Sequence, residues 1–103
     1  MIKISAVIAT RNRKDSLYKT LHALSNQSCN LQEVIIVDSS DEKLDESELL
    51  KIFSVLNIKY ITSTPSVCLQ RNIGIRKSTS DYIFICDDDV EPVPTYVFAL
   101  SKF

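Results

Sequence analysis

The chain has 103 residues, of which 45 % are hydrophobic and 24 % are charged, a composition typical of one soluble globular domain. Twelve lysines and arginines against thirteen aspartates and glutamates leave a formal net charge of −1, so no basic excess favours nucleic acid or an anionic membrane surface as a partner. Gly74 is the single glycine, which excludes the P-loop and the GxGxxG loop, because both need several glycines where backbone approaches phosphate.

The first half of the chain predicts two strands and two helices. Residues 2–10 are rich in isoleucine and valine, which is typical of a strand buried on both faces. Leucines then recur at helical spacing over residues 14–25, and residues 33–38 (EVIIVD) form a second apolar strand that ends in an acid. Asp45 and Glu48 have the spacing of a helix-capping pair, so a second helix is expected to start there.

The second half continues this alternation. Residues 58–62 predict a short third strand, and a third helix follows over residues 66–77. Residues 81–86 (DYIFIC) predict the fourth strand, and another helix begins within residues 95–103, after two prolines break the chain. Strands that alternate with helices predict an α/β fold with a doubly wound, mainly parallel sheet and helices on both faces.

Polar residues gather where the predicted strands end. Ligands of doubly wound sheets bind at the carboxyl ends of the strands, and those ends carry Thr10-Arg11-Asn12, Asp38-Ser39-Ser40 and Asp87-Asp88-Asp89. Arg71 lies early on the third predicted helix and is expected at the same edge of the sheet. The sequence therefore predicts a ligand site at this edge.

Asp87 and Asp89 form a D-x-D pair directly after an apolar strand. Alternate residues of an extended segment point to the same side, so the pair predicts a site for a hard divalent cation, Mg²⁺ or Mn²⁺, with diphosphate oxygens as further ligands. The alternative is a solvated acidic turn before a proline. A calcium-binding loop is excluded, because Pro92 and Phe98 stand where an EF-hand needs glycine and glutamate.

Asp38 and Arg71 each have two interpretations. Asp38 suits a hydrogen bond to a base or a ribose hydroxyl, and it equally suits capping of the turn that follows it. Arg71 suits a phosphate or the edge of a base, since its guanidinium presents several donors in a fixed geometry. An ordinary ion pair on the surface of a helix explains Arg71 as well.

The cysteines and the N-terminus bear on the compartment. Cys29, Cys68 and Cys86 are odd in number and lack a CxxC spacing, so free thiols are expected instead of a disulfide or a zinc site. The N-terminal apolar stretch is too short for a signal sequence or a bilayer span. We therefore expect a cytoplasmic protein without a membrane segment.

Four segments, AVIATRNR, EVIIVDSS, LQRNIGI and DYIFICDDDVEPVP, follow one another as the signature segments of family 2 glycosyltransferases do. The resemblance runs from Lys3 to about Tyr96 and rests on four motifs in order at the right spacing. It implies the GT-A fold of nucleotide-diphospho-sugar transferases. It also implies a nucleotide-diphospho-sugar as the partner, with a UDP-sugar as the first choice, and a divalent cation, Mg²⁺ or Mn²⁺, as the cofactor.

The resemblance assigns nucleotide-binding roles to residues on three segments. Thr10 and Arg11 match positions at which the family contacts the nucleotide base. Asp38 matches an aspartate that hydrogen-bonds the uracil ring. Arg71 matches the arginine of an Ala-Arg-Asn segment that lies beside the nucleotide.

The D-x-D pair matches the family's metal site. The resemblance places Asp87 near the ribose or the sugar and beside the metal, and it places Asp89 on the metal, which neutralises the departing diphosphate. Departures from the family pattern at Ala9, Arg11 and the Ser39-Ser40 pair bear on which base is recognised more than on the fold.

Family members are much longer chains, whose second half supplies the acceptor site and a carboxylate that acts as general base. We therefore expect residues 1–103 to form a single nucleotide-sugar-binding domain from a longer glycosyltransferase, with no catalytic residue assigned. Strands that would extend the sheet are missing, so the edge of the fourth strand is expected to be exposed and to pair in a homodimer.

Two rival functions also fit a doubly wound sheet with acids at its edge. A response-regulator receiver is disfavoured, because receivers carry an acid pair after the first strand, where this chain has Thr10-Arg11-Asn12-Arg13. A non-catalytic nucleotide-binding or assembly module of the same fold stays open, as the alternative to donor binding for inverting sugar transfer.

Overall fold

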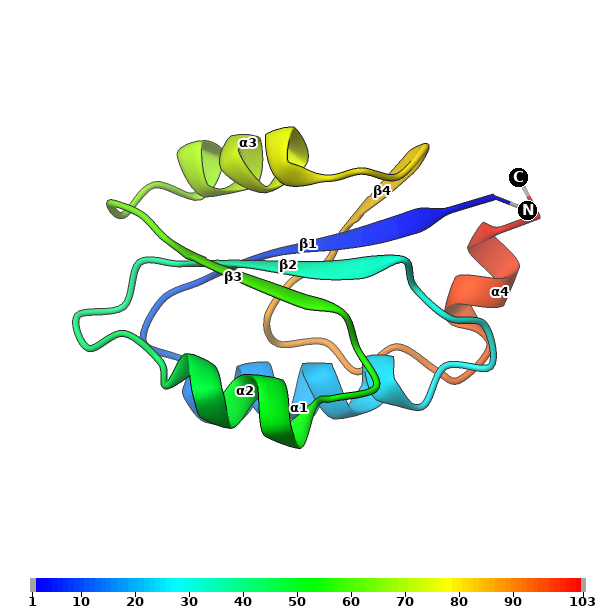
Figure 1. Cartoon of the computed structure of the whole chain (residues 1–103), viewed down its shortest axis with the longest axis horizontal. Coiled ribbons are helices and arrows are strands. Elements are labelled where there is room, and N and C mark those ends of the chain that lie inside the picture. Colours follow the sequence, from blue (N-terminus) through cyan, green and yellow to red (C-terminus); the bar gives the residue numbers. More distant parts are fainter. Residues whose placement is uncertain (1, 103) are drawn as a thin grey trace.

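The computed structural model describes residues 2–102, and in this part of the chain strands alternate with helices (Figure 1). All of the predicted elements are present. In chain order they are β1 (Ile4–Thr10), α1 (Lys14–Ser25), β2 (Glu33–Asp38), α2 (Glu46–Ile52), β3 (Ile58–Thr62), α3 (Val67–Lys77), β4 (Tyr82–Ile85) and α4 (Tyr96–Leu100).

The differences from the sequence predictions lie at the ends of elements. β1 begins at Ile4, two residues later than expected, and β4 spans only Tyr82–Ile85. The last helix covers five residues, Tyr96–Leu100, whereas the predicted segment ran to Phe103, which lies outside the described residues.

Two helices begin at caps that are visible in the sequence. The Asp45 carboxylate accepts a hydrogen bond from the Glu48 backbone N–H at 3.2 Å, and the Ser66 hydroxyl accepts one from the Leu69 N–H at 3.3 Å. Each bond satisfies a backbone donor that has no partner inside the helix. The predicted capping role of Asp45 is therefore confirmed.

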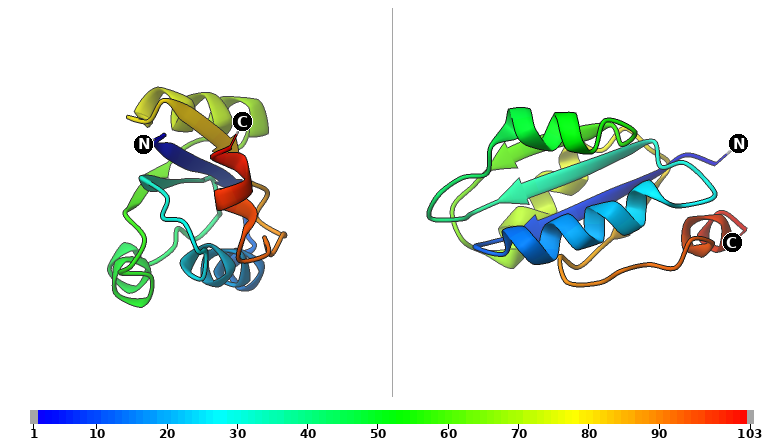
Figure 2. Two further views of the ribbon diagram at one scale, coloured as in Figure 1. Left: turned by 90° about the vertical axis from the view of Figure 1, so that its right-hand side faces the viewer. Right: turned by 90° about the horizontal axis from the view of Figure 1, so that it is seen from below.

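The sheet is entirely parallel and has the strand order β3-β2-β1-β4. Helices α1 and α2 cover one face and α3 covers the other, while α4 lies near the amino ends of the strands (Figures 1 and 2). This arrangement confirms the predicted fold class. The winding reverses between β1 and β4, and the carboxyl end of such a reversal is where doubly wound sheets bind ligands.

The core lies on both faces of β1 and β2, which explains why their sequences are nearly continuous apolar runs. A larger cluster under α1 and α2 contains the buried Phe53 and the leucines of α1. A smaller cluster lies under α3 and consists of Val7, Ile35 and Val37, with Ile61 and Ile73 packed against it. The strands at the centre of the sheet are therefore the most firmly held.

Helix α3 approaches the sheet closely at Gly74. A Cβ atom at this position would overlap the Cγ1 atom of Val7 on β1. Valine is stiff about its first side-chain torsion and is fully buried here, so it has little room to turn away. Gly74 thus sets the distance between α3 and β1.

A buried carboxylate holds the amino end of the sheet. Glu33 is 1 % exposed and accepts hydrogen bonds from the Ser5 hydroxyl at 2.6 Å and the Thr79 backbone N–H at 2.6 Å, while the Lys59 ammonium lies 2.6 Å away. Burial acts to raise the pKa of Glu33, but Lys59 and these hydrogen bonds outweigh it and lower the pKa to about 2. The contacts join β1, β2, β3 and the segment after α3.

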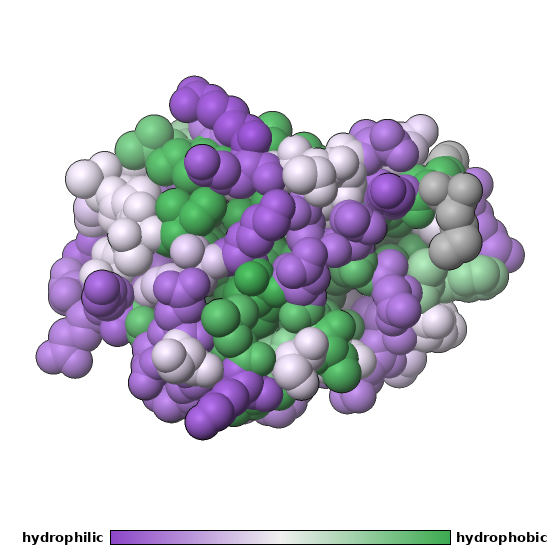
Figure 3. Space-filling view, viewed as in Figure 1, coloured by the Kyte–Doolittle hydropathy of each residue, from purple (hydrophilic) through white to green (hydrophobic). Residues whose placement is uncertain are grey.

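The surface is mixed, and β4 is its least covered strand. On the face shown in Figure 3, apolar side chains lie in separate groups among polar ones. Tyr82, Ile83 and Ile85 on β4 are 55 %, 37 % and 39 % exposed, so this edge of the sheet presents apolar surface, as predicted. No helix within residues 2–102 is long and apolar enough to cross a membrane.

We predict that Gly74→Ala lowers the free energy of unfolding, because overpacking of a core typically costs about 1–3 kcal/mol. In a Val7→Ala background the same substitution should raise it, by up to about 1 kcal/mol, because alanine favours a helix more than glycine does. Urea denaturation of the four proteins measures both effects. A stabilising Gly74→Ala in the unaltered background would contradict the close approach of α3.

Candidate functional site

A pocket of about 530 Å³ opens at the carboxyl ends of β1 and β4, where the winding of the sheet reverses. Its size lies within the range of small-molecule sites. Three segments line it: the end of β1 with the loop after it, the start of α3, and the segment after β4. The lining residues are Ala9, Thr10, Arg11, Arg13, Pro65, Ser66, Val67, Gln70, Arg71, Cys86, Asp87 and Asp88.

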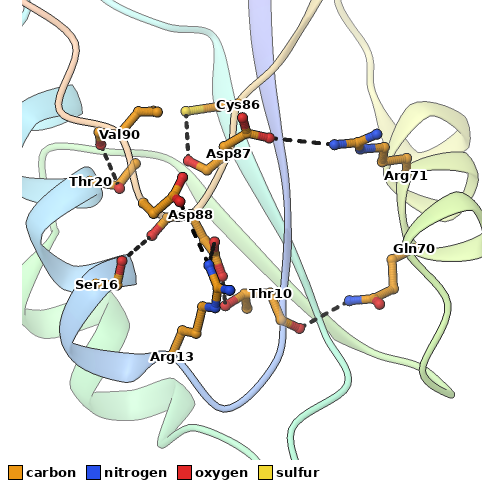
Figure 4. Close-up of polar contacts among 11 residues, drawn as sticks. Thr10, Arg13, Ser16, Thr20, Gln70, Arg71, Cys86, Asp87, Asp88 and Val90 are labelled. Atoms are coloured by element: carbon orange, nitrogen blue, oxygen red, sulfur yellow. Dashed lines mark hydrogen bonds and ion pairs between the residues drawn. The ribbon is translucent and has the colours of Figure 1, made fainter.

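Asp88, the middle aspartate of the triplet, is turned into the protein and is 8 % exposed. Its carboxylate accepts hydrogen bonds from the Thr10 hydroxyl at 2.8 Å and from the Arg13 guanidinium at 3.4 Å. The Ser16 hydroxyl donates to the Asp88 backbone carbonyl at 2.8 Å (Figure 4). Asp88 therefore ties the segment after β4 to the end of β1 and to the start of α1.

The outer aspartates of the triplet stay exposed. The side chains of Asp87 and Asp89 are 63 % and 57 % exposed, and each faces one arginine in a long ion pair. The Arg71 guanidinium lies 3.4 Å from Asp87, and the Arg13 guanidinium lies 3.7 Å from Asp89. Arg71 and Arg13 thus lie against different aspartates of the triplet. Exposed pairs of this kind stabilise a fold little, so the carboxylates of Asp87 and Asp89 stay accessible.

Metal ligation by the D-x-D pair stays a prediction. Among residues 2–102 there is no group of three or more aspartate, glutamate, histidine or cysteine side chains placed to hold a metal ion. Asp87 and Asp89 offer hard oxygen ligands, which suit Mg²⁺ or Mn²⁺. A cation held by these two residues would need further ligands from its substrate or from water.

The loop after β1 brings two more arginines to the pocket. Arg11 donates to the Ser39 carbonyl at 3.3 Å and pairs with Asp41 at 3.0 Å, so it bridges the loops after β1 and β2. Arg13 reaches across to the aspartate triplet. With Arg71 from α3, three arginines line one pocket, and each is paired with an aspartate. An anion that binds here can use guanidinium donors in exchange for these pairs.

Asp38 is the predicted nucleotide-binding residue that is not at the pocket. It is 1 % exposed and does not line the pocket. Its carboxylate accepts hydrogen bonds from the Ser40 N–H at 2.9 Å and the Tyr60 hydroxyl at 2.5 Å. Burial and the bond to Asp38 raise the pKa of Tyr60. Asp38 thus caps the turn after β2, and contact with a base stays a prediction for it.

The structure therefore brings Thr10, Arg11, Arg71 and Asp87 together around one pocket, while Asp38 and Asp89 are outside its lining. Sequence reasoning missed Asp88 and Arg13. Alternation along an extended segment gave the only signal for Asp88, since the middle residue of three points away from its neighbours. For Arg13 the chain offered only its place in the loop after β1.

The pocket contains a thiol that is unsuited to nucleophilic chemistry. Cys86 is 2 % exposed, and burial, followed by the charges of the three aspartates, raises its pKa to about 12. A thiol with such a pKa stays protonated near neutral pH and is a poor nucleophile. All three cysteines are free, as the sequence predicted.

Residues 5–102 match the family model described as Glycosyl transferase family 2. The chain belongs to this family. It is 36 % identical over 98 residues to a chondroitin synthase of Escherichia coli, and the aligned region covers 91 % of this chain and 14 % of the synthase. It is 29 % identical over 101 residues to the uncharacterized glycosyltransferase YwdF of Bacillus subtilis, and that alignment covers 98 % of this chain and 38 % of YwdF. The family 2 chain thus spans well under half of these relatives.

Solved structures confirm the fold of this glycosyl transferase family 2 chain. The crystal structure of residues 1–349 of TarS from S. aureus superposes with a TM-score of 0.85 at 20 % identity, over 98 % of this chain and 32 % of that one. The same TarS fragment in complex with UDP-GlcNAc gives a TM-score of 0.81 at 18 % identity, over 98 % and 30 % of the two chains. The predicted GT-A fold is therefore confirmed.

We predict that Asp88→Ala and Asp87→Ala differ in their effect on stability. Asp88→Ala should lower the free energy of unfolding by about 1–3 kcal/mol, because it leaves the buried Thr10 hydroxyl without its acceptor. Asp87→Ala removes an exposed carboxylate and should stay within about 0.5 kcal/mol of the unaltered chain. Urea denaturation compares the neighbours directly, and equal losses would contradict the bridging role of Asp88.

Proposed function

We propose that residues 1–103 form a single nucleotide-sugar-binding domain of a longer family 2 glycosyltransferase. The domain binds a nucleotide-diphospho-sugar, most simply a UDP-sugar, through a divalent cation, for inverting transfer of the sugar to an acceptor. One observation carries the proposal: in a family 2 chain, three arginines line one pocket at the carboxyl edge of the sheet together with Asp87 and Asp88, and Asp89 lies against one of these arginines, Arg13.

Different residues around the pocket suit different parts of the nucleotide-sugar. Thr10 and Arg11, at the carboxyl end of β1, suit the base and the sugar attached to it. Asp38 would reach the base once the turn after β2 adjusts. Arg71, at the start of α3, suits the diphosphate, because its guanidinium offers paired donors to phosphate oxygens. Asp87 lies beside Arg71, where it suits a ribose or sugar hydroxyl.

The carboxylates at the pocket mouth fit a divalent cation. Asp89 and Asp87 are exposed and present hard oxygen ligands, and Mg²⁺ in particular is usually held by one or two carboxylates together with phosphate oxygens. With fewer than three ligands gathered here, metal and diphosphate are expected to bind together. When bound, the cation would neutralise the charge of the departing diphosphate. Arg13 would then exchange its contact with Asp89 for one with phosphate.

Two points favour uridine as the nucleoside. The TarS fragment, which shares this fold, has been crystallised with UDP and with UDP-GlcNAc. Asp38 suits the N–H of a uracil ring. UDP is therefore the nucleotide to test first, and the donor sugar is left open.

Transfer of the sugar needs more than this pocket. No residue of the chain is assigned as the general base, so catalysis is proposed for the longer protein and not for these residues alone. The alternative is a non-catalytic nucleotide-binding or assembly module of the same fold. An assay of the longer protein for transfer or hydrolysis with a panel of UDP-sugars separates the two, since a non-catalytic module would release no UDP there either.

We predict that UDP binds at least about tenfold more tightly with Mn²⁺ than without it, a difference of about 1.4 kcal/mol. The gain should disappear in Asp89→Ala, which loses the proposed metal ligand, and should persist in Asp81→Ala, which removes an exposed acid before β4. Calorimetric titration of UDP into each protein measures the affinities. Metal-independent binding, or equal gains in both variants, would contradict the metal-bridged diphosphate.

We also propose that the chain forms a homodimer through the edge of β4 that has no partner strand within residues 2–102. The strand has β1 as its partner on one side, and its other side carries backbone groups and exposed apolar residues that favour pairing with another strand. Analytical ultracentrifugation over a range of concentrations should show a dimer that Ile83→Lys weakens. A monomer at every concentration would contradict this proposal.

A further inference from the structure

Gln70 is a buried side chain at the carboxyl edge of the sheet that makes four hydrogen bonds. It lies on α3 and is 3 % exposed. Its amide nitrogen donates to the Thr10 carbonyl of β1 at 3.0 Å and to the Val37 carbonyl of β2 at 2.8 Å. Its amide oxygen accepts from the Ser39 hydroxyl at 3.2 Å and from the Ser66 backbone N–H at 3.3 Å.

The partners fix the orientation of the amide. Carbonyl oxygens only accept, so the group facing Thr10 and Val37 must be the nitrogen with its two donors. A backbone N–H only donates, so the group facing Ser66 must be the oxygen. Both halves of the amide are therefore fully used, and a carboxylate or an apolar side chain of the same length cannot replace it.

We infer that Gln70 is a positioning residue that sets the geometry of the nucleotide pocket. It joins three of the four chain segments that carry the proposed binding residues, namely the ends of β1 and β2 and the start of α3. Thr10 is itself a partner, Arg11 comes directly after it, and Arg71 comes directly after Gln70 on α3 (Figure 4). A shift of α3 relative to the sheet would move Arg71 away from Thr10, and the bonds of Gln70 to Thr10, Val37 and Ser39 oppose that shift.

The loop after β2 is coupled to the same amide. Ser39 gives its hydroxyl hydrogen to Gln70, its backbone N–H to the Thr10 carbonyl at 3.0 Å, and its own carbonyl accepts from Arg11 at 3.3 Å. Gln70 thus also supports the contact that holds Arg11. The inference rests on the proposed function, because a positioning role requires that the pocket bind a ligand.

The test compares Gln70→Met with Glu33→Gln. Gln70→Met keeps the length of the side chain and removes all four hydrogen bonds. Glu33→Gln weakens a buried network of similar size at the opposite, amino end of the sheet. Calorimetry with UDP and Mn²⁺ measures binding, urea denaturation measures stability, and amide hydrogen exchange reports on Ser39 and Leu69 without any nucleotide.

We expect Gln70→Met to weaken UDP binding by about tenfold, which corresponds to about 1.4 kcal/mol, and to speed exchange at both amides. Glu33→Gln should lower stability and leave both readings unchanged. Should Gln70→Met fail to fold, Ser39→Ala, which removes one of the four bonds, should show the same changes to a smaller degree.

Unchanged binding in a folded Gln70→Met would overturn the inference, even with faster exchange, because the residue would then serve stability alone. Unchanged exchange would overturn it as well. If the unaltered chain does not bind UDP in either metal condition, the proposed function fails. The exchange measurement then decides by itself whether Gln70 holds the ends of β1 and β2 against α3.

Discussion

The arrangement of the pocket depends on one buried carboxylate, that of Asp88. By accepting hydrogen bonds from Thr10 and Arg13, it draws the segment after β4 against the end of β1, across the point where the winding of the sheet reverses. Turning Asp88 inward leaves Asp87 and Asp89 facing solvent. The repulsion expected of three adjacent acids is met by a hydroxyl and two arginines, which places the cationic groups at the pocket as well.

The polar contacts at the two ends of the sheet differ in burial and in length. At the amino end, Glu33 is buried with close contacts to β1, β3 and the segment after α3, which is an arrangement that resists change. At the carboxyl end, Arg13 and Arg71 are about half exposed and pair with the aspartate triplet at 3.4–3.7 Å. Pairs of this kind contribute little to stability, so a diphosphate and a cation can replace them at small cost. Tight contacts at the carboxyl end, such as those of Asp88 and Gln70, lie beneath the pocket.

The sequence predicted every element, the fold class and the edge at which polar residues gather, because periodicity and strand burial depend on local patterns. It did not predict how the polar side chains pair. The sequence left Asp38 equally suited to a base contact and to a turn cap. The structure shows the cap, which depends on Tyr60, 22 residues away on β3, and contact with a base stays a prediction. Asp88, Arg13 and Gln70 were missed for the same reason: each acts through partners that only the folded sheet brings near.

The central claim is that a divalent cation and a nucleotide diphosphate bind together at the aspartate triplet. Paramagnetic broadening of the amide NMR signals by Mn²⁺ tests this most directly, because it reports where the ion lies. With UDP present, the account predicts broadening centred on residues 87–89, extending to Thr10 and the start of α3, and much weaker broadening when UDP is omitted. Broadening centred on the acidic segment of residues 41–48, or an identical pattern with and without UDP, would contradict it.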